Sequence, residues 1–374
     1  MKLTIERAAL LKALGHVQSV VERRNTIPIL SNVLLSARPS GLALSATDLD
    51  MEIIDETSAH VETPGQITAP AHTLYEIVRK LPEGAEISLS FNGEDPRLQV
   101  RAGRYRVNLP VLPAGDFPIM SSDGLSGPVS VDTVGLMRLI DRTRFAISTE
   151  ETRYYLNGIF LHATDSAGAP VLRAVATDGH RLARIEEPLP EGAAGMPGVI
   201  IPRKTVNEVR KLAEETQDEI AIRLSETKIR FEIGTVHLTS KLIDGTFPEY
   251  DRVIPRGNDK ILRVSKKEFA EAVGRVAAIS SERSRPVKLS IDRNHLLLSA
   301  SSAEQGQAQE ELDADVVQYE SSPLEIGFQA RYLNDITDQI ADQVEFRFAD
   351  GSAPTVVTDS AKPEALYVLM PMRV

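Results

Sequence analysis

The chain has 374 residues, no cysteine and no tryptophan, and a formal net charge of −11. Without a thiol it has no disulfide framework, no cysteine-based zinc site and no cysteine nucleophile. Charges recur through the opening MKLTIERAALLKAL, and no apolar run approaches the roughly 18 residues of a membrane span, so we expect a cytoplasmic protein without a membrane partner. The length favours two or three domains, and the acidic balance by itself argues against a nucleic-acid partner.

The first third of the chain predicts a strand followed by an amphipathic helix, in LTIERAALLKALGHV from Leu3. We expect this helix over 7–24 and a second helix over 71–81. The apolar residues of the second helix fall on one face of it: Leu74, Ile77, Val78 and Leu81. The alternation in EISLSF and RLQVRAGRYRVNL then predicts half-buried antiparallel strands.

The same order of elements recurs twice. VSVDTVGLMRLIDRT from Val129 and LRVSKKEFAEAVGRV from Leu262 predict helices over 132–147 and 265–281. VIIPRKTVNEVRKLA and IGFQARYLNDITDQI predict second helices over 202–215 and 330–341. We therefore expect an α+β fold of three similar domains, each with two helices packed on antiparallel sheet. The predicted domains are 1–125, 126–253 and 254–374.

The six predicted helices carry six more basic than acidic side chains, so the rest of the chain carries seventeen more acidic than basic ones. An acidic body with a basic helical layer repels phosphate everywhere except at that layer. The alternative is that the helices have only the usual solvated Lys and Arg.

Six short motifs occur in order along the whole chain: PILSN (28–32), RYYLNG (153–158), ATDGHRLA (176–183), IPRK (201–204), SKLIDGTFPEY (240–250) and MPMRV (370–374). On these motifs the chain resembles the bacterial DNA polymerase III beta subunit family, the sliding clamps. The resemblance implies a DNA clamp fold, a head-to-tail homodimer closed as a ring around double-stranded DNA, and a role as processivity factor of the replicative polymerase. It implies no cofactor, no metal and no catalytic activity.

The resemblance also implies contacts to DNA phosphates without base reading, which suits a protein that slides. The implied contact residues are Arg24, Tyr154, Tyr155, Arg203 and Lys204. For the two tyrosines, partial burial on the strand after the 132–147 helix is an alternative. The chain departs from relatives at His72 and Thr73, where they tend to carry Arg, and at Glu150, where they have Gln.

The stretch VATDGHRLARI at 175–185 places an acid, a histidine and two arginines between apolar residues. The resemblance assigns it to a pocket for short linear peptides of polymerases and other clamp-binding proteins. The implied pocket residues are Leu156, Thr177, Gly179, His180, Arg181, Leu182, Pro248, Arg252, Val253, Pro354, Val368, Met370, Pro371 and Met372. Apolar and thioether side chains suit such an adaptable slot, with Arg and backbone groups at its rim. Pro354 departs from the small polar residue of many relatives. As an alternative, Asp178 caps a turn and Arg181 pairs with it.

For the dimer interface the resemblance implies Val107 on one side and Ala278 with Ile279 on the other, with ordinary core packing as the alternative. The chain has no G-x-x-x-x-G-K-[ST] loop, so we expect a separate clamp loader ATPase complex to open the ring.

Two other function classes compete with a clamp. One is a hydrolase using Asp178, His180 and a serine, although three such residues in one strand and turn are the wrong layout for a triad. The other is a peptide-binding scaffold without a DNA role, which needs no basic helices. A cation site at Asp48, Asp50 and Glu52 is a further possibility, against an exposed strand edge.

Overall fold

The computed structural model describes residues 1–93, 95–279, 286–362 and 364–373. Within these residues the chain forms six α-helices and antiparallel sheets, and none of the helices is long and apolar enough to cross a membrane. Contacts divide the chain into two compact units. Unit 1 is Met1–Met137 with Lys204–Leu242, and unit 2 is Arg138–Arg203 with Ile243–Val374. The division into 1–125, 126–253 and 254–374 stays a prediction.

Unit 1 contains a sheet of five strands, which confirms the predicted alternation in EISLSF and RLQVRAGRYRVNL. In spatial order its strands are β5 (His60–Thr63), β1 (Lys2–Glu6), β7 (Glu86–Ser90), β8 (Arg97–Ala102) and β9 (Tyr105–Pro110). Ile87 and Leu89 are buried on one face, and their neighbours along β7 are more exposed. Among the strands that the structure describes, β9 pairs with β8 alone and is therefore an edge strand.

A second sheet of unit 1 joins strands from distant parts of the chain. In spatial order they are β10 (Val129–Val131), β15 (Ile220–Leu224), β16 (Lys228–Ile233), β17 (Val236–Lys241), β4 (Met51–Thr57), β3 (Gly41–Thr47), β2 (Asn32–Arg38) and β6 (Gly65–Pro70). The pairing of β4 with β17 places Met51 opposite Ser240 and Asp55 opposite Val236. This antiparallel ladder makes the two distant segments one sheet.

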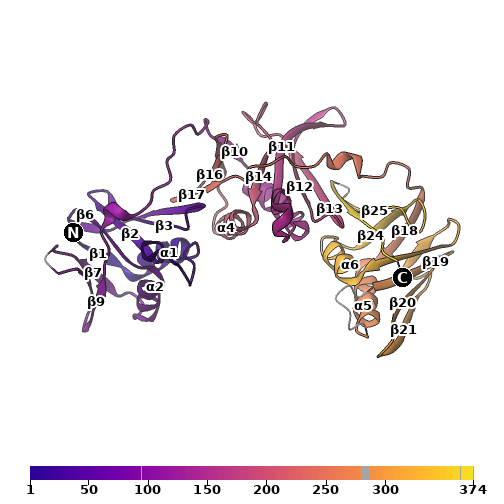
Figure 1. Cartoon of the computed structure of the whole chain (residues 1–374), viewed down its shortest axis with the longest axis horizontal. Coiled ribbons are helices and arrows are strands. Elements are labelled where there is room, and N and C mark those ends of the chain that lie inside the picture. The colour runs from indigo at the N-terminus through magenta and orange to yellow at the C-terminus, as the bar shows by residue number, and fades with distance from the viewer. Residues whose placement is uncertain (94, 280–285, 363, 374) are drawn as a thin grey trace. The chain divides into compact units, whose positions relative to one another are not determined.

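The helices α1 (Arg7–Gln18) and α2 (Ala71–Lys80) lie side by side in unit 1 (Figure 1). The prediction of one helix over 7–24 was too long. Ser19 donates its hydroxyl to the carbonyl of His16 at 2.7 Å, a local bond that competes with helix continuation. The β-branched Val20 and Val21, which have low helix propensity, follow in a turn with both side chains buried.

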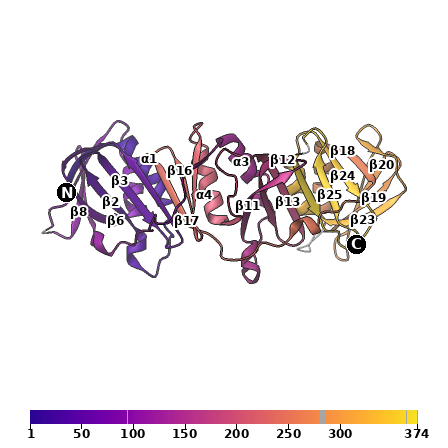
Figure 2. The same ribbon diagram turned by 90° about the horizontal axis from the view of Figure 1, so that it is seen from above.

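Unit 2 contains a sheet of nine strands. In spatial order they are β14 (Val199–Pro202), β11 (Gly158–Ser166), β12 (Ala169–Thr177), β13 (Arg181–Pro188), β26 (Ala365–Leu369), β25 (Thr355–Asp359), β24 (Gln343–Phe348), β18 (Lys260–Ser265) and β22 (Val317–Tyr319). Figure 2 shows β24 and β25 side by side near β18. A smaller sheet has the order β21 (Gly306–Leu312), β20 (His295–Ser302), β19 (Pro286–Asp292) and β23 (Leu324–Gln329).

The helices α5 (Lys266–Ala277) and α6 (Ala330–Thr337) pack against each other in unit 2 (Figure 1). The unit boundaries cut α3 (Thr133–Asp141) and α4 (Arg203–Ala213), so each belongs partly to both units. All six predicted helices are therefore confirmed, with shorter bounds, and positions 280–281 of the helix predicted over 265–281 lie outside the described residues. Short 3-10 turns complete the chain: Pro28–Ser31, Ala114–Asp116, Arg144–Ala146, Glu151–Leu156 and Tyr250–Arg252.

A buried polar network ties three strands of unit 2 to the turn at Tyr250. Arg173 on β12 donates to Glu186 on β13 at 2.8 Å and to the Tyr250 hydroxyl at 2.9 Å. The same hydroxyl lies 2.8 Å from Nε2 of His162 on β11. Burial, together with the charge of Arg173, lowers the pKa of His162 and so favours the neutral ring, which can accept the Tyr250 hydrogen at Nε2.

The network predicts the effect of removing one hydroxyl. Tyr250→Phe leaves a buried N–H of Arg173 and the ring of His162 without this partner, so we expect the free energy of unfolding to fall by about 1–3 kcal/mol. Tyr154→Phe is the matched control, since Tyr154 is 55% exposed. Urea unfolding followed by circular dichroism measures both, and equal stability of the two variants would contradict the network's contribution.

Candidate functional site

The TDGHR segment forms a tight turn between β12 and β13. The Asp178 carboxylate accepts hydrogen bonds from the backbone N–H of His180 at 2.9 Å and of Arg181 at 3.0 Å. Thr177 donates its hydroxyl to the carbonyl of Arg181 at 2.7 Å. Gly179 has a φ of 88°, and a Cβ there would lie 2.3 Å from the Arg153 guanidinium. The turn therefore requires glycine at this position.

Arg181 is buried below this turn, with 5% of its surface exposed. Its Nε donates to Asp178 at 3.1 Å, Nη1 to Asp335 at 2.5 Å, and Nη2 to the carbonyl of Phe145 at 2.7 Å. Its guanidinium also lies over the ring of Tyr332, 4.4 Å from the centroid. The alternative in which Asp178 caps the turn and pairs with Arg181 is confirmed, and every nitrogen of this guanidinium is engaged inside the protein.

Nine of the predicted pocket residues line one cavity of about 290 Å³ in unit 2: Leu156, Thr177, Gly179, Arg181, Leu182, Pro248, Val253, Val368 and Met370. Arg153, Tyr155, Glu249 and Tyr250 complete its lining. These four were not among the predicted pocket residues, although Arg153 and Tyr155 belong to RYYLNG and the other two to SKLIDGTFPEY. Those two motifs were the sequence feature that could have identified these residues as part of the lining.

The cavity has an apolar floor and an exposed apolar mouth. Leu156, Leu182 and Val368 belong to one buried cluster with Val175, Ile200, Phe247 and Tyr250. At the mouth, Val253 is 52% and Met370 42% exposed. Exposed apolar side chains beside a concave surface indicate a ligand site.

Five predicted pocket residues lie outside the cavity lining, and their part in peptide binding stays a prediction. The His180 ring stacks on Tyr332 with centroids 6.3 Å apart, and the exposed Arg252 pairs with Glu249 at 2.5 Å. The carbonyl of Pro354 accepts a hydrogen bond from Asn258. Met372 donates its N–H to the carbonyl of Gly327 at 2.9 Å, which turns the chain at Pro371 and Met372 along β23.

The hydrolase alternative does not fit this geometry. The Asp178 carboxylate serves backbone N–H groups and Arg181, and the His180 ring packs on Tyr332. The cation site at Asp48, Asp50 and Glu52 is wrong as well. Asp50 pairs with Lys241 at 3.0 Å, Glu52 is buried, and the described residues hold no group of His, Asp or Glu arranged for a metal.

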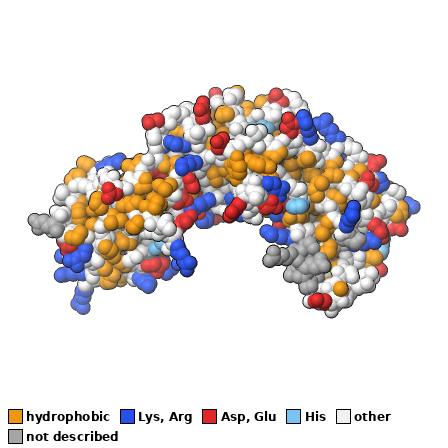
Figure 3. All heavy atoms as spheres, in the orientation of Figure 1, with side chains coloured by type: hydrophobic (Ala, Val, Ile, Leu, Met, Phe, Trp, Pro, Cys, Tyr) orange, Lys and Arg blue, Asp and Glu red, His pale blue; other side chains and the backbone are white. Residues whose placement is uncertain are grey.

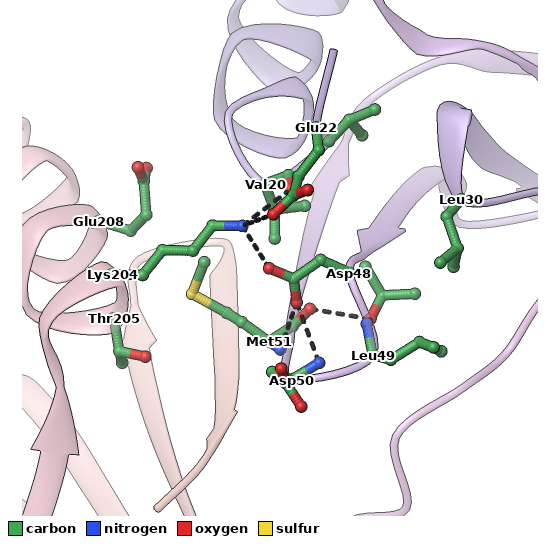
Figure 4. Close-up of polar contacts among 12 residues, drawn as sticks. Val20, Glu22, Leu30, Asp48, Leu49, Asp50, Met51, Lys204, Thr205 and Glu208 are labelled. Atoms are coloured by element: carbon green, nitrogen blue, oxygen red, sulfur yellow. Dashed lines mark hydrogen bonds and ion pairs between the residues drawn. The ribbon is translucent and has the colours of Figure 1, made fainter. Parts of the chain in front are cut away.

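Lys204, a predicted DNA contact, is held by carboxylates of unit 1 (Figure 4). Its ammonium bonds to Asp48 and lies 3.5 Å from both Glu22 and the carbonyl of Val20. Burial works to lower its pKa, but the hydrogen bond and charges of Asp48 and Glu22 outweigh burial and raise it. Lys204 therefore stays charged, with its charge locally balanced.

The other predicted DNA contacts differ in exposure. Arg24, Arg203 and Tyr154 are exposed, and Tyr155 is half-buried with its ring edge-on to Tyr154 at 5.8 Å. Of the departures from relatives, Glu150 pairs with Arg153 at 2.8 Å and His72 lies 2.9 Å from Gln18. Partial burial is thus confirmed for Tyr155 alone of the two tyrosines, and DNA contact stays a prediction for all five residues.

The predicted interface residue Val107 lies on the edge strand β9, beside a cavity of about 520 Å³. The cavity lining is His72, Thr73, Glu76, Ile77, Lys80, Leu81 and Tyr105. Tyr105, which is 42% exposed, was not among the predicted interface residues, although it lies two positions before Val107 in the predicted strand. In unit 2, Ala278 is exposed and Ile279 half-buried just after α5.

Three family models match the chain in order. They describe the N-terminal, central and C-terminal domains of the DNA polymerase III beta subunit and match residues 1–121, 130–249 and 251–373. The chain is 64% identical to the beta sliding clamp of Caulobacter vibrioides and 37% identical to that of Escherichia coli K12, over the full length of each protein.

Solved structures agree with these matches. A crystal structure of the C. crescentus beta sliding clamp, 64% identical, superposes with a TM-score of 0.97 and covers 100% of this chain and 99% of that one. The sliding clamp of Bartonella birtlesii bound to griselimycin, 48% identical, has a TM-score of 0.96 with 100% of both chains covered. Matches of this identity over the whole length place the chain in the DNA polymerase III beta subunit family, the beta sliding clamps.

Proposed function

We propose that this chain is a replicative processivity clamp of the cytoplasm. Two copies join head to tail as a closed ring around double-stranded DNA, without sequence specificity. The ring tethers the replicative polymerase and other proteins through peptides that bind the 290 Å³ cavity. The observation that carries this proposal is that cavity, with its apolar floor and exposed mouth, in a chain of this family.

The cavity suits a short peptide with apolar side chains. Its volume accommodates one or two large side chains, while the exposed Val253 and Met370 extend the apolar contact along the surface. Arg252, with an 81% exposed side chain, supplies donors beside the mouth for acidic or amide side chains of the ligand. The Bartonella relative, solved with griselimycin, supports ligand binding by clamps of this family.

Ring closure by a heterologous contact is supported by two sheet edges. β9 in unit 1 and β21 in unit 2 are both edge strands of their sheets. Arg101, Arg104 and Arg106 are exposed on the β8–β9 hairpin, and Figure 3 shows Lys and Arg side chains gathered there. Glu304 and Glu311 are exposed on the β20–β21 hairpin. Opposite charges on the two edges favour a head-to-tail contact between copies, and two such contacts close a ring.

The apolar part of this contact is supported by the cavity beside β9. Tyr105, Ile77 and Leu81 offer an apolar surface there. In the proposed dimer this surface meets Ala278 and Ile279 of the other copy, which supply small and branched side chains. Unpaired strand edges invite pairing with another chain, so the two edges extend the interface by backbone bonds.

Binding to DNA is supported by the basic helical layer. Arg203 at the start of α4 and Arg24, which follows α1 outside the helix, are exposed and suited to phosphate attraction without base contacts. We expect Lys204 to contribute less attraction, since Asp48 and Glu22 balance its charge. Because the chain has no ATP-binding loop, a separate ATP-driven loader opens the ring in this proposal.

The pocket assignment predicts a loss of peptide affinity in Val253→Glu. The new carboxylate must be desolvated against an apolar ligand, so we expect a polymerase-derived clamp-binding peptide to bind roughly 10- to 100-fold more weakly. Fluorescence anisotropy with a labelled peptide measures this affinity. Val134→Glu, at a residue 58% exposed and outside the cavity, is the control. Equal affinity of both variants and the original protein would refute the pocket.

The ring predicts a charge-dependent dimer. Arg104→Glu with Arg106→Glu places like charges on the two edges, and we expect the dimer dissociation constant to rise at least about tenfold. Adding Glu304→Arg and Glu311→Arg to the same chain restores opposite charges and should recover the dimer. Sedimentation equilibrium measures both, and a dimer indifferent to the first pair of changes would exclude these edges as the interface.

Topological binding predicts different behaviour on circular and linear DNA. We expect the protein, once loaded, to stay on nicked circular DNA through a high-salt wash and to leave when the circle is cut, because a closed ring slides off a free end. Gel filtration of the protein–DNA mixture measures retention. Equal retention on both forms would show attachment by direct contact and overturn the ring. Release of the protein from both circular and linear DNA in high salt would also contradict the ring.

A further inference from the structure

His16 is a buried histidine that lies between two carboxylates in unit 1. It stands near the end of α1 and is 8% exposed. Its Nδ1 lies 2.7 Å from Oδ2 of Asp55, and its Nε2 lies 3.0 Å from Oε2 of Glu215. Asp55 is on β4 and 3% exposed, whereas Glu215 follows the end of α4.

The groups that surround His16 come from every element packed around it. Asp55 also accepts the hydroxyl hydrogen of Thr235, from the turn between β16 and β17, at 2.7 Å. Lys12, one turn earlier on α1, pairs with Glu215 at 3.3 Å. We call Lys12, His16, Asp55, Glu215 and Thr235 the His16 cluster. The cations and carboxylates of this cluster balance only when the imidazole is protonated.

The geometry selects the protonation state of the ring. A neutral imidazole has one N–H, so one of its nitrogens would direct a lone pair at a carboxylate oxygen. The imidazolium donates to both carboxylates at once, and such charge-assisted bonds are the stronger kind. Burial acts to lower the pKa of His16, but the hydrogen bonds and charges of Asp55 and Glu215 outweigh burial and raise it above its ordinary 6.5.

The two carboxylates belong to segments that match different family models. Asp55 lies within 1–121, matched by the N-terminal domain, and Glu215 lies within 130–249, matched by the central domain. Besides the cluster, these segments are joined by the β4–β17 ladder and by the contact of Lys204 with Glu22 and Asp48. Lys204 lies at the start of α4 and Glu215 beyond its end, so charged contacts hold both ends of this helix.

We propose that protonated His16 is a positioning residue that fastens the end of α4 to α1 and β4, so that this joint between the N-terminal and central segments loosens as the pH rises. The Lys204 contact keeps its charge over the same range, since its pKa is raised from an already basic value. Only the His16 end of α4 therefore responds to pH. Both helices belong to the layer proposed to face DNA, and that consequence alone rests on the proposed function.

The sign of the pH effect follows from the two opposite shifts. His16 binds its proton more tightly in the folded chain, so its contribution is complete below its ordinary pKa of 6.5 and is lost as the pH rises through the raised value. Burial raises the pKa of Glu215, but the bonds to His16 and Lys12 lower it overall, so its contribution is lost only below about 4.5. The His16 cluster therefore contributes most to stability between about pH 4.5 and pH 6.5.

Histidine NMR without DNA tests the protonation state. In protein labelled with ¹⁵N at its seven histidines, the resonance that disappears in His16→Gln identifies His16. We expect it to titrate with a midpoint above 6.5 and with both nitrogens protonated at pH 6. A midpoint at or below 6.5, or a single protonated nitrogen at pH 6, would overturn the proposal.

Thermal unfolding tests the joint itself. We expect His16→Gln to lower the Tm by about 2–4 °C at pH 6 and to change it little at pH 9, because the lost ion pairs exist only at the lower pH. Glu215→Gln, at a 47% exposed side chain that tolerates substitution, should lose most of the same pH dependence. His60→Gln, at an exposed histidine of β5, is the matched control and should keep the original dependence.

A double-mutant cycle between His16→Gln and Glu215→Gln separates a direct contact from a general loss of stability. We expect a coupling free energy between the two residues at pH 6 and none at pH 9. The same coupling free energy at both pH values would refute the proposal. None of these measurements involves DNA. Failure of retention on nicked circles would therefore contradict the ring and leave the His16 result standing.

Discussion

The pairing of β13 with β26 is the constraint on which the pocket depends. Its ladder sets Arg181 opposite Leu369 and Leu182 opposite Val368, so the end of the chain lies beside the TDGHR turn. The backbone N–H of Met370 then bonds to the carbonyl of His180 at 2.9 Å, which carries Met370 to the mouth of the cavity. A slip of β26 by one residue in this register would turn Val368 to the opposite face and remove its side chain from the apolar floor.

Beneath this ladder, Arg181 connects the turn to the helix α6. Its three nitrogens bond to Asp178, Asp335 and the carbonyl of Phe145, which belong to distant stretches of unit 2. A buried guanidinium with every nitrogen engaged holds those stretches in one geometry, since loss of a partner leaves a buried N–H donor without its acceptor. The TDGHRL motif thus fixes the cavity wall through Arg181, while Gly179, Thr177 and Leu182 line the cavity beside it.

Internal ion pairs also reduce the attraction of the basic helices for phosphate. The helical layer is rich in Lys and Arg, yet Lys204 faces Asp48 and Glu22, and Arg210 faces Glu214 at 2.8 Å. A cation paired with a carboxylate attracts phosphate less than a free one, so the count of basic residues overstates the field of the layer. Exposed arginines such as Arg24 and Arg203 carry the attraction to DNA in the proposed ring.

The sequence by itself determined the repeat, the positions of the six helices and the alternating strands, because periodicity is a local property of the chain. The family resemblance carried by its short motifs, and not the periodicity, implied most of the residues that line the cavity. The sequence overextended the helix that ends at Gln18, since a serine bond and two β-branched residues there outweigh the apolar pattern. Only the tertiary structure decided that Arg181 is enclosed, that Lys204 is paired, and that His16 lies between Asp55 and Glu215, which are 39 and 199 residues away. Such contacts depend on which strands and helices pack together. A local pattern in the sequence does not show which residues 39 or 199 positions apart will come into contact.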